Sequence, residues 1–202
     1  MRMRINPASP FARKVRIVAR EANLMSRLEE IDTAVSPVTP NPDLAGANPL
    51  VKIPALILDD GTTLYDSRVI AEYLDSLAGA KLFPASGTER WNELRLQALC
   101  DGILDAAVLT RYEMAVRPQP QQWQEWIAGQ RRKIDGGVAA LEREHAGWGE
   151  RFRIGQIGAA CVLGYLDFRF PQIDWRSAHP GLKGWFQRVS ERTSVRETMP
   201  PA

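Results

Sequence analysis

The stretch from Asn6 to Phe11 combines a hydroxyl, prolines and an apolar residue at the start of a predicted helix. Ser9 precedes Pro10 and an apolar helical pattern, so we expect Ser9 as the N-cap and Pro10 as the first helical residue. The start of a helix carries unpaired N–H groups and positive potential, which favour an anion. If that anion is a thiolate, the Ser9 hydroxyl can donate a hydrogen bond to it. The alternative is an ordinary helix cap without a ligand, which is the commoner case.

Two later stretches also place distinctive residues at the ends of predicted elements. Apolar runs flank Asp59-Asp60-Gly61, a pattern typical of a β-hairpin over residues 52–64. Pro54 stands just before the first strand of this hairpin, where a missing N–H is tolerated. Asp66 and Ser67 then precede another apolar helical pattern, so a second helix cap is expected there.

The cysteines and histidines do not form a pattern typical of a metal or redox site. Cys100 and Cys161 are the only cysteines, and their separation fits neither a Cys-x-x-Cys pair nor a disulfide framework. We expect both to be small buried residues. His145 and His179 do not stand at a spacing typical of metal ligands, so no metal is expected.

The composition is that of an ordinary soluble globular protein. The 202 residues are 45% apolar and 25% charged, with a formal net charge of +2. Because no basic block stands out, nucleic acid is not an expected partner. No apolar run is long enough to span a membrane, and the first four residues lack the apolar core of a signal peptide. A cytoplasmic location without membrane partners is therefore the default expectation.

The first 78 residues alternate between strand and helix signals. Residues 1–5 and 28–31 are strand candidates, separated by the helix that begins at Pro10, and an irregular segment over 33–49 precedes the hairpin. The first helix has four basic residues mostly on its polar face, opposite its apolar stripe: Arg13, Lys14, Arg16 and Arg20. This order of elements predicts an α/β arrangement with a mixed sheet.

Strand signals stop near residue 89, and long helical patterns take over. They cover residues 89–116, 121–146 and 157–170, and a last helix begins at Pro180. The third pattern is apolar nearly all round, which indicates a central buried helix. We therefore predict an α/β domain over 1–78, a linker over 79–88 and an all-helical bundle over 89–202.

Several motifs follow one another in a fixed order. The N-terminal ones are Ser9-Pro10-Phe11-Ala12-Arg13-Lys14-Val15, Asn48-Pro49-Leu50-Val51-Lys52-Ile53-Pro54, and Asp66-Ser67 followed by Ile70-Ala71-Glu72-Tyr73-Leu74. The C-terminal ones are Ala98-Leu99-Cys100-Asp101-Gly102-Ile103, Arg117-Pro118, Gln130-Arg131-Arg132-Lys133-Ile134 and His179-Pro180-Gly181-Leu182. Over essentially the whole chain, this order and spacing resembles cytosolic glutathione S-transferases of the bacterial serine type and is similar to their YibF-like group.

The resemblance implies a thioredoxin-like N-terminal domain that binds glutathione as a co-substrate. It implies an all-helical C-terminal domain that supplies the pocket for a second substrate, a homodimer with the glutathione site near the interface, and a role in detoxification. Carried onto this chain, it assigns the hydrogen bond to the glutathione sulfur to Ser9 and makes Phe11 a glutathione-binding residue.

The resemblance assigns the remaining parts of glutathione to three further positions. Pro54 is expected to be a cis-proline that turns the backbone of Ile53 toward the cysteinyl part of the ligand. Asp66 is assigned to the ammonium of the γ-glutamyl end, and Ser67 with its helix N-terminus to the carboxylate.

Two departures from the family pattern affect these expectations. Val51 stands where the family often has glycine, and a β-branched residue resists a positive φ, so the loop around Lys52 is expected to differ. Lys52 therefore either binds the glycyl carboxylate or is a plain surface lysine. The central helix also lacks the usual Ser/Thr-x-x-Asp capping box, since Gln156 and the three residues after it stand there.

Several other residues each allow two interpretations of their role. Tyr112 and Tyr165 either line the second-substrate pocket or pack within the helical domain. Asp101 is either structural or contacts glutathione across the dimer. Arg111 and Arg117 are either solvated charges or anion contacts.

The expected activity is attack of the glutathione thiolate on an electrophilic carbon of a small, mostly apolar molecule. The alternatives are reduction of a peroxide or disulfide by bound glutathione, and a non-catalytic binding or regulatory protein of the same fold. The residues Ser9, Pro54, Asp66 and Ser67 favour a working glutathione site.

Overall fold

The computed structural model describes residues 1–79 and 81–201, so Ala80 of the predicted linker and Ala202 lie outside the described residues. Four strands form one sheet in the order β2-β1-β3-β4. β1 pairs in parallel with β2 and antiparallel with β3, which pairs antiparallel with β4. Their bounds are β1 Arg2–Ile5, β2 Glu29–Asp32, β3 Ala55–Ile57 and β4 Thr63–Leu64. The mixed sheet predicted from the order of elements is confirmed.

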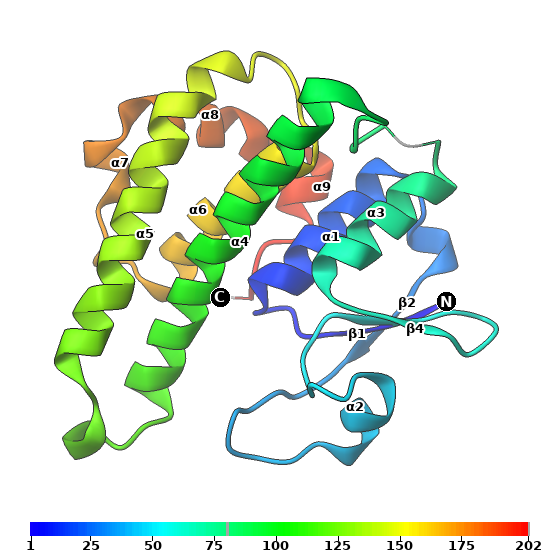
Figure 1. Cartoon of the computed structure of the whole chain (residues 1–202), viewed down its shortest axis with the longest axis horizontal. Helices are drawn as coiled ribbons and strands as arrows, with labels where there is room; N and C mark the ends of the chain where they lie inside the picture. The colour runs from blue at the N-terminus through cyan, green and yellow to red at the C-terminus, as the bar shows by residue number, and fades with distance from the viewer. Residues whose placement is uncertain (80, 202) are drawn as a thin grey trace.

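Helices lie on both faces of this sheet. Helices α1 (Pro10–Glu21) and α3 (Ser67–Leu77) cover one face, and the short α2 (Pro42–Ala47) lies on the other side (Figure 1). A 3-10 turn η1 (Met25–Arg27) leads from α1 to β2. The prediction of an irregular segment over 33–49 was wrong at α2, where Asn41 caps the helix by accepting a hydrogen bond from the Leu44 amide at 3.0 Å.

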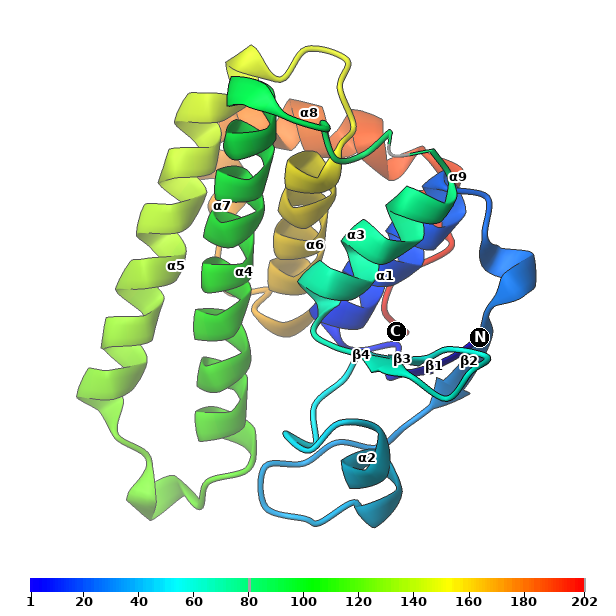
Figure 2. The same ribbon diagram turned by 45° about the vertical axis from the view of Figure 1, so that its right-hand side comes forward.

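Within residues 81–201, the regular elements of the C-terminal part are all helices or 3-10 turns. The long helices α4 (Gly87–Ala115) and α5 (Gln124–Glu144) run side by side, next to α6 (Ile154–Arg169) (Figure 2). The remaining elements are η2 (Gln119–Gln121), η3 (His145–Gly147), α7 (Trp175–Ala178), α8 (Pro180–Ser190) and α9 (Thr193–Arg196). A thioredoxin-like part followed by a helical bundle is thus confirmed as the fold. No helix of residues 1–79 and 81–201 combines the length and apolarity needed to cross a membrane.

The central helix α6 is buried from Ile154 through Leu166, as its all-round apolar pattern predicts. It begins three residues earlier than predicted, and its first turn is capped by other means than the family's box. The side chain of Gln156 accepts a hydrogen bond from the Arg153 amide at 2.8 Å. Glu93 of α4 accepts one from the Gly155 amide at 3.0 Å. The helix thus lacks the Ser/Thr-x-x-Asp box, as expected, but its cap lies at Arg153 and Gln156 instead of at residues 156–159.

A buried carboxylate fixes the chain where it leaves α3. Asp75 is 1% exposed, and its two oxygens accept hydrogen bonds from the amides of Lys81, Leu82 and Phe83 at 2.9–3.0 Å. The Leu82 carbonyl in turn accepts a hydrogen bond from the amide of Ile154, at the start of α6. This links the end of α3 to the buried centre of the helical part.

Helix α1 is covered on two sides, which corrects the prediction for its basic residues. α1 contacts α3 within the N-terminal part and α4, α6 and α9 in the C-terminal part. As a result Arg13 and Lys14 are buried, at 2% and 0% exposure, instead of facing solvent.

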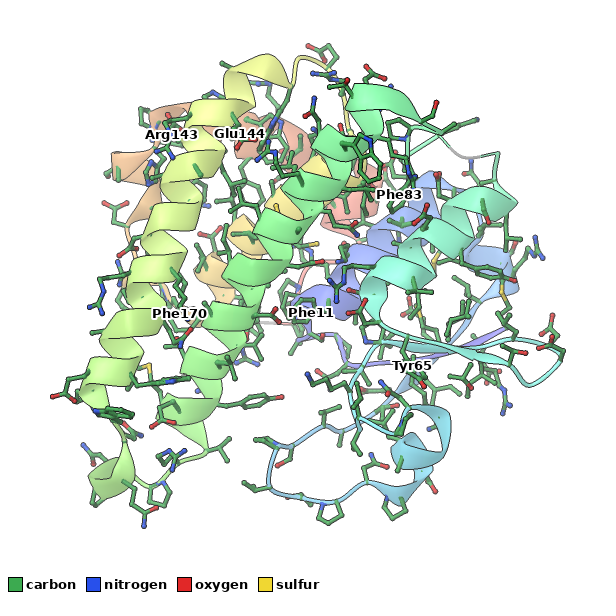
Figure 3. All side chains as sticks on the ribbon, viewed as in Figure 1. Phe11, Tyr65, Phe83, Arg143, Glu144 and Phe170 are labelled. Carbon is green, nitrogen blue, oxygen red and sulfur yellow. The ribbon has the colours of Figure 1, made fainter. Side chains whose placement is uncertain are left out.

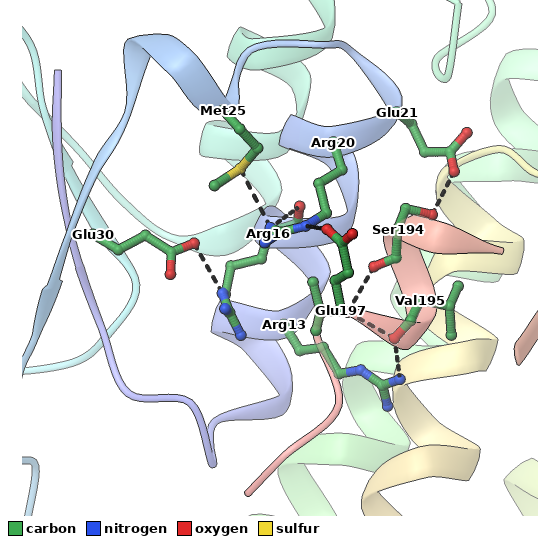
Figure 4. A network of polar contacts seen from close by, with 10 residues as sticks. Arg13, Arg16, Arg20, Glu21, Met25, Glu30, Ser194, Val195 and Glu197 are labelled. Carbon is green, nitrogen blue, oxygen red and sulfur yellow. Dashed lines mark hydrogen bonds and ion pairs between the residues drawn. The ribbon is translucent and has the colours of Figure 1, made fainter.

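Polar contacts fasten α9 to the outer side of α1 (Figure 4). Arg13 Nη2 donates to the Val195 carbonyl at 3.2 Å, and Arg20 pairs with Glu197 at 3.2 Å. The Ser194 hydroxyl donates to Glu21. The C-terminal segment therefore holds α1 from the side opposite the sheet.

Candidate functional site

The strand pairing brings the three stretches singled out in the sequence to the same end of the sheet. Arg4 of β1 pairs with Ala55 at the start of β3, and Leu56 pairs with Leu64 at the end of β4. Because β3 runs antiparallel to both neighbours, the residues after β1, before β3 and after β4 lie at the same end of the sheet. These are the stretches that contain Ser9, Pro54 and Asp66.

Ser9 is the N-cap of α1, as predicted. Its Oγ accepts a hydrogen bond from the Ala12 amide at 3.2 Å, and Pro10 occupies the first helical turn. Asn6 shapes the preceding turn, since its side chain accepts from the Ala8 amide at 3.0 Å and its carbonyl from the Ser9 amide at 2.9 Å. Within the described part of the chain, no acceptor takes the Ser9 hydroxyl hydrogen, so this hydrogen is available to a ligand.

Phe11 is half-buried in the first turn of α1. The Nζ atom of Lys14 lies 6.0 Å from the centre of its ring. Figure 3 shows Phe11 at the start of α1, close to α4. The residue thus stands beside the helix N-terminus that Ser9 caps.

The peptide bond between Ile53 and Pro54 is cis, as the resemblance implied. Pro54 is buried just before β3, whereas the backbone N–H and C=O of Ile53 have no backbone partner in residues 1–79 and 81–201. An unpaired N–H and C=O next to a strand can add an extended peptide to the sheet. This is the chemistry required to hold a peptide-like ligand.

The loop before Ile53 keeps the conformation that Val51 was expected to resist. Val51 adopts a φ of 52°, in the left-handed region. Asn48, which is 2% exposed, holds the loop: its side chain donates to the Lys52 carbonyl at 2.8 Å and accepts from the Leu50 amide at 3.0 Å. The expectation that Val51 alters the loop was therefore wrong. Lys52 itself is exposed.

Asp66 and Ser67 begin α3, and Asp66 has a partner that the sequence did not reveal. Its carboxylate accepts a hydrogen bond from the Arg68 amide at 2.9 Å and pairs with the Arg68 guanidinium at 2.7 Å. Partial burial acts to raise the pKa of Asp66, but the hydrogen bonds and charge of Arg68 and the charge of Lys14 lower it below its ordinary value. Asp66 is thus ionised at neutral pH, half-exposed and able to accept a further donor. Ser67 is 3% exposed.

A buried ion pair stands behind the start of α1. Lys14 Nζ lies 2.6 Å from Asp101 Oδ1 of α4, and the second oxygen of Asp101 is buried without a partner in the described residues. Burial raises the pKa of Asp101 despite the attraction of Lys14. Asp101 therefore joins α4 to α1 through Lys14, and its contact with glutathione across a dimer stays a prediction.

The two tyrosines considered for the second-substrate pocket differ in burial. Tyr165 is 5% exposed and packs edge-to-face against Phe170 with ring centres 6.3 Å apart, and burial raises its pKa to about 12. Tyr112, near the end of α4, is half-buried. Tyr165 thus packs in the helical part, and the ligand role of both residues stays a prediction.

The cysteines lie outside this chemistry. Cys100 and Cys161 are fully buried and unpaired, as predicted, and burial raises the pKa of both thiols. A thiol in this state is a poor nucleophile, because the thiolate is the reactive form. If the site carries out thiol chemistry, the reactive thiol therefore comes from a bound ligand and not from Cys100 or Cys161.

Known proteins resemble the chain over both of its parts. Residues 8–77 match the family described as glutathione S-transferase, N-terminal domain, and residues 124–188 match glutathione S-transferase, C-terminal domain. The uncharacterised GST-like protein YibF of Escherichia coli K12 is 32% identical, over 96% of this chain and 95% of its own length.

Solved structures of glutathione transferase family members are also similar to the chain over its whole length or nearly so. A glutathione transferase family member from Pseudomonas fluorescens Pf-5, crystallised with bound glutathione, is 47% identical with a TM-score of 0.97 and covers 100% of this chain and 99% of its own. A second structure from that organism contains S-(propanoic acid)-glutathione, with 46% identity, a TM-score of 0.92 and full coverage of both chains. A glutathione-bound protein from Methylobacillus flagellatus is 36% identical with a TM-score of 0.88, over 99% of each chain.

Proposed function

The chain belongs to the glutathione S-transferase family, and we propose that it binds glutathione and activates its thiol for attack on an electrophilic carbon of a small molecule. The observation that carries this proposal is the available hydroxyl hydrogen of Ser9 at the N-terminus of α1. The oxygen keeps its cap role toward Ala12 while the hydrogen is donated to the thiolate.

The energy available at this helix start is sufficient for thiol activation. A cysteine thiol titrates near about 8.5, and lowering its pKa by about two units requires about 2.7 kcal/mol of preference for the thiolate. A helix N-terminus contributes up to about 2 kcal/mol in favourable sites. A hydrogen bond to a charged group contributes about 1.5–3 kcal/mol. Ser9 therefore acts as a hydrogen-bond donor, and a basic side chain is not required.

The other parts of glutathione follow the sheet edge. The backbone of Ile53 pairs with the cysteinyl unit, Asp66 accepts the γ-glutamyl ammonium, and Ser67 with the start of α3 receives the carboxylate. Lys52, whose side chain is exposed after the loop held by Asn48, binds the glycyl carboxylate in this proposal. The similar proteins crystallised with glutathione support glutathione as the ligand.

Conjugation is favoured over reduction by the ligand of the second Pseudomonas fluorescens structure. S-(propanoic acid)-glutathione carries carbon on the sulfur, as the product of attack on carbon does. Reduction of a peroxide or disulfide by bound glutathione is the second candidate, and a non-catalytic protein of the same fold is the third.

We further propose that the protein is a homodimer. Apolar side chains of α3 and α4 are exposed in the single chain: Val69 at 49%, Trp91 at 68% and Leu109 at 48%. Burial of such side chains against a second copy stabilises a dimer. Light scattering is expected to give twice the chain mass of 22.6 kDa; a mass equal to one chain contradicts the dimer.

The proposed activity is tested with calorimetry of glutathione binding and the rate of conjugation to a chlorodinitrobenzene probe. The protein is expected to bind glutathione and to form the conjugate. Ser9→Ala is expected to retain binding within about threefold and to lose at least about tenfold in rate, because one charge-assisted hydrogen bond is lost. Ser9→Thr, which keeps both the cap oxygen and the hydroxyl hydrogen, serves as the matched control and retains most of the rate.

Each alternative has its own result. Binding of glutathione with turnover of a peroxide or disulfide, and no conjugate, identifies the reductase. Binding without either reaction identifies a binding protein. Absence of glutathione binding contradicts the site itself.

A further inference from the structure

Two arginines near the predicted second-substrate pocket have no carboxylate partner in the described residues. They are Arg111, next to Tyr112 on α4, and Arg169, the last residue of α6. Neighbouring arginines are paired, since Arg117 lies 2.8 Å from Glu113, and Arg176 binds Asp167 through both of its terminal nitrogens. The positive charges of Arg111 and Arg169 are therefore not neutralised by an ion pair in the described residues, in contrast to those of Arg117 and Arg176.

Helix geometry places Arg111 on the side of α4 that meets α1. Steps of three and four residues from Asp101 lead to Leu104, Val108 and then Arg111 and Tyr112, so these residues form one stripe along α4, in which Tyr112 lies nearly in line with Asp101 and Arg111 about 80° round the helix from it. Asp101 is the residue through which α4 pairs with Lys14 of α1. The face that carries Arg111 therefore continues from the α1 contact toward the end of α4.

Helix α6 reaches the same region from the other side. Gly164 lies against the guanidinium of Arg13, where a side chain on Gly164 would collide with it. The C-terminal end of α6 lies beside the N-terminal end of α1 in both views (Figures 1 and 2). Tyr165 and Arg169 follow Gly164 toward that end, and so toward the start of α1 that Ser9 caps.

Three side chains of this region, Arg111, Tyr112 and Arg169, act on the buried Tyr165. Burial dominates the raised pKa of Tyr165, and against it the charges of Arg169 and Arg111 act to lower the pKa while Tyr112 acts to raise it. The guanidinium of Arg169 also lies over the ring of Phe168, with its Cζ 3.8 Å from the ring centre. Stacking on an aromatic ring holds a guanidinium in place and leaves its edge for a carboxylate.

We propose that Arg111 and Arg169 bind a carboxylate of the second substrate, so that the electrophile is a short aliphatic acid whose reactive carbon lies next to the glutathione sulfur. This inference rests on the proposed transferase function and narrows its substrate class. It also revises the expectation of a mostly apolar electrophile: the carbon chain contacts apolar side chains, and the acid end contacts the arginines.

The reaction on such a substrate needs no further reagent. With a 3-halopropanoate, the thiolate sulfur attacks carbon 3 and forms the S–C bond. The C–halogen bond breaks, and its electron pair leaves with the halide ion. The carboxylate is unchanged in the thioether product, so it can stay bound to the arginines throughout.

The test compares kcat/KM for 3-bromopropanoate with that for 3-bromopropanamide, which has similar size and no charge. The unmodified protein is expected to prefer the acid by about tenfold after correction for the uncatalysed rates, as loss of a charge-assisted contact predicts. Arg111→Met and Arg169→Met are each expected to raise KM for the acid and lower its kcat/KM about tenfold, with the amide changed less than about twofold. Arg132→Met, an exposed arginine of α5, is the matched control and leaves both values unchanged.

Equal kcat/KM for the two probes in the unmodified protein overturns the inference without any variant, and so does an equal loss on acid and amide in Arg111→Met and Arg169→Met. If neither probe is conjugated and glutathione does not bind, the proposed function itself fails. The two failures are thereby distinguished.

Discussion

At the residue scale, the proposed function gives one serine hydroxyl two partners. The oxygen of Ser9 holds the first turn of α1 through the Ala12 amide, and its hydrogen is available to a ligand sulfur. Neither role interferes with the other, because an oxygen can accept and donate at the same time. The cap also orients the hydroxyl before the ligand arrives.

Val51 carries backbone strain that glycine would relieve. A positive φ costs a residue with a Cβ about 1–2 kcal/mol, and a β-branched residue is especially disfavoured there. Val51→Gly is therefore expected to raise the free energy of unfolding by about 1 kcal/mol, after allowance for the greater freedom of glycine in the unfolded chain. Urea unfolding measures the change.

Val51→Ala is the control for this change, because alanine retains a Cβ and hence most of the strain. It is expected to unfold at no higher urea concentration than the unmodified protein. If Val51→Gly is the least stable of the three proteins, the loop is not strained at this residue.

Helices α1 and α4 are joined at the element scale by the buried pair of Lys14 and Asp101. Removal of one partner from a buried ion pair costs about 3–5 kcal/mol, because the other charge is left uncompensated. Lys14→Met is expected to lower the free energy of unfolding by about 3 kcal/mol near neutral pH. Arg131→Met, which breaks the exposed pair with Asp135, is the control and is expected to cost less than about 1 kcal/mol.

The loss in Lys14→Met is expected to depend on pH. Burial already raises the pKa of Asp101 in the folded state, so its contribution to stability is full at low pH and is lost as the pH rises through that raised value. Without Lys14 the pKa of Asp101 rises further. Chemical unfolding at about pH 5 should therefore show a smaller loss than at about pH 7.5; an equal loss at both values contradicts the role of the Asp101 charge.

The helices and strands could be predicted from sequence where local signals are strong. Ser9-Pro10 and Asp66-Ser67 mark their helices because caps are local. The short α2 was missed because one turn of apolar spacing does not stand out in a proline-rich segment. The burial of Arg13 and Lys14 could not be predicted, because it depends on helices more than 80 residues later in the chain that cover the polar face of α1.

For the candidate site, the sequence indicated the residues that come together but not the side chains that contact them. The residues at the sheet edge carry family motifs, and topology brings them together. The partners that tune them, Arg68 beside Asp66 and Lys14 behind the start of α1, depend on side-chain directions that no spacing reveals.

The two parts of the chain meet on α1 at the scale of the whole molecule. The sheet and α3 lie on one side of this helix, while α4, α6 and α9 lie on the other. The N-terminus of α1 consequently lies between the end of the sheet that carries Pro54 and the C-terminal end of α6. Under the proposed function, this arrangement would let the start of α1 stabilise the sulfur of glutathione while the helical part selects the electrophile.

Under the proposed function, the start of α1 and the Ser9 hydroxyl together stabilise bound glutathione as a thiolate. The most direct measurement is the pH titration of the ultraviolet thiolate absorbance of glutathione bound to the protein, in the unmodified form and in Ser9→Ala. We predict a thiol pKa of about 6.5 in the unmodified protein, against about 8.5 for an ordinary thiol, and a rise of at least about one unit in Ser9→Ala. A bound thiol that titrates near 8.5 in the unmodified protein, or identically in both proteins, contradicts the account.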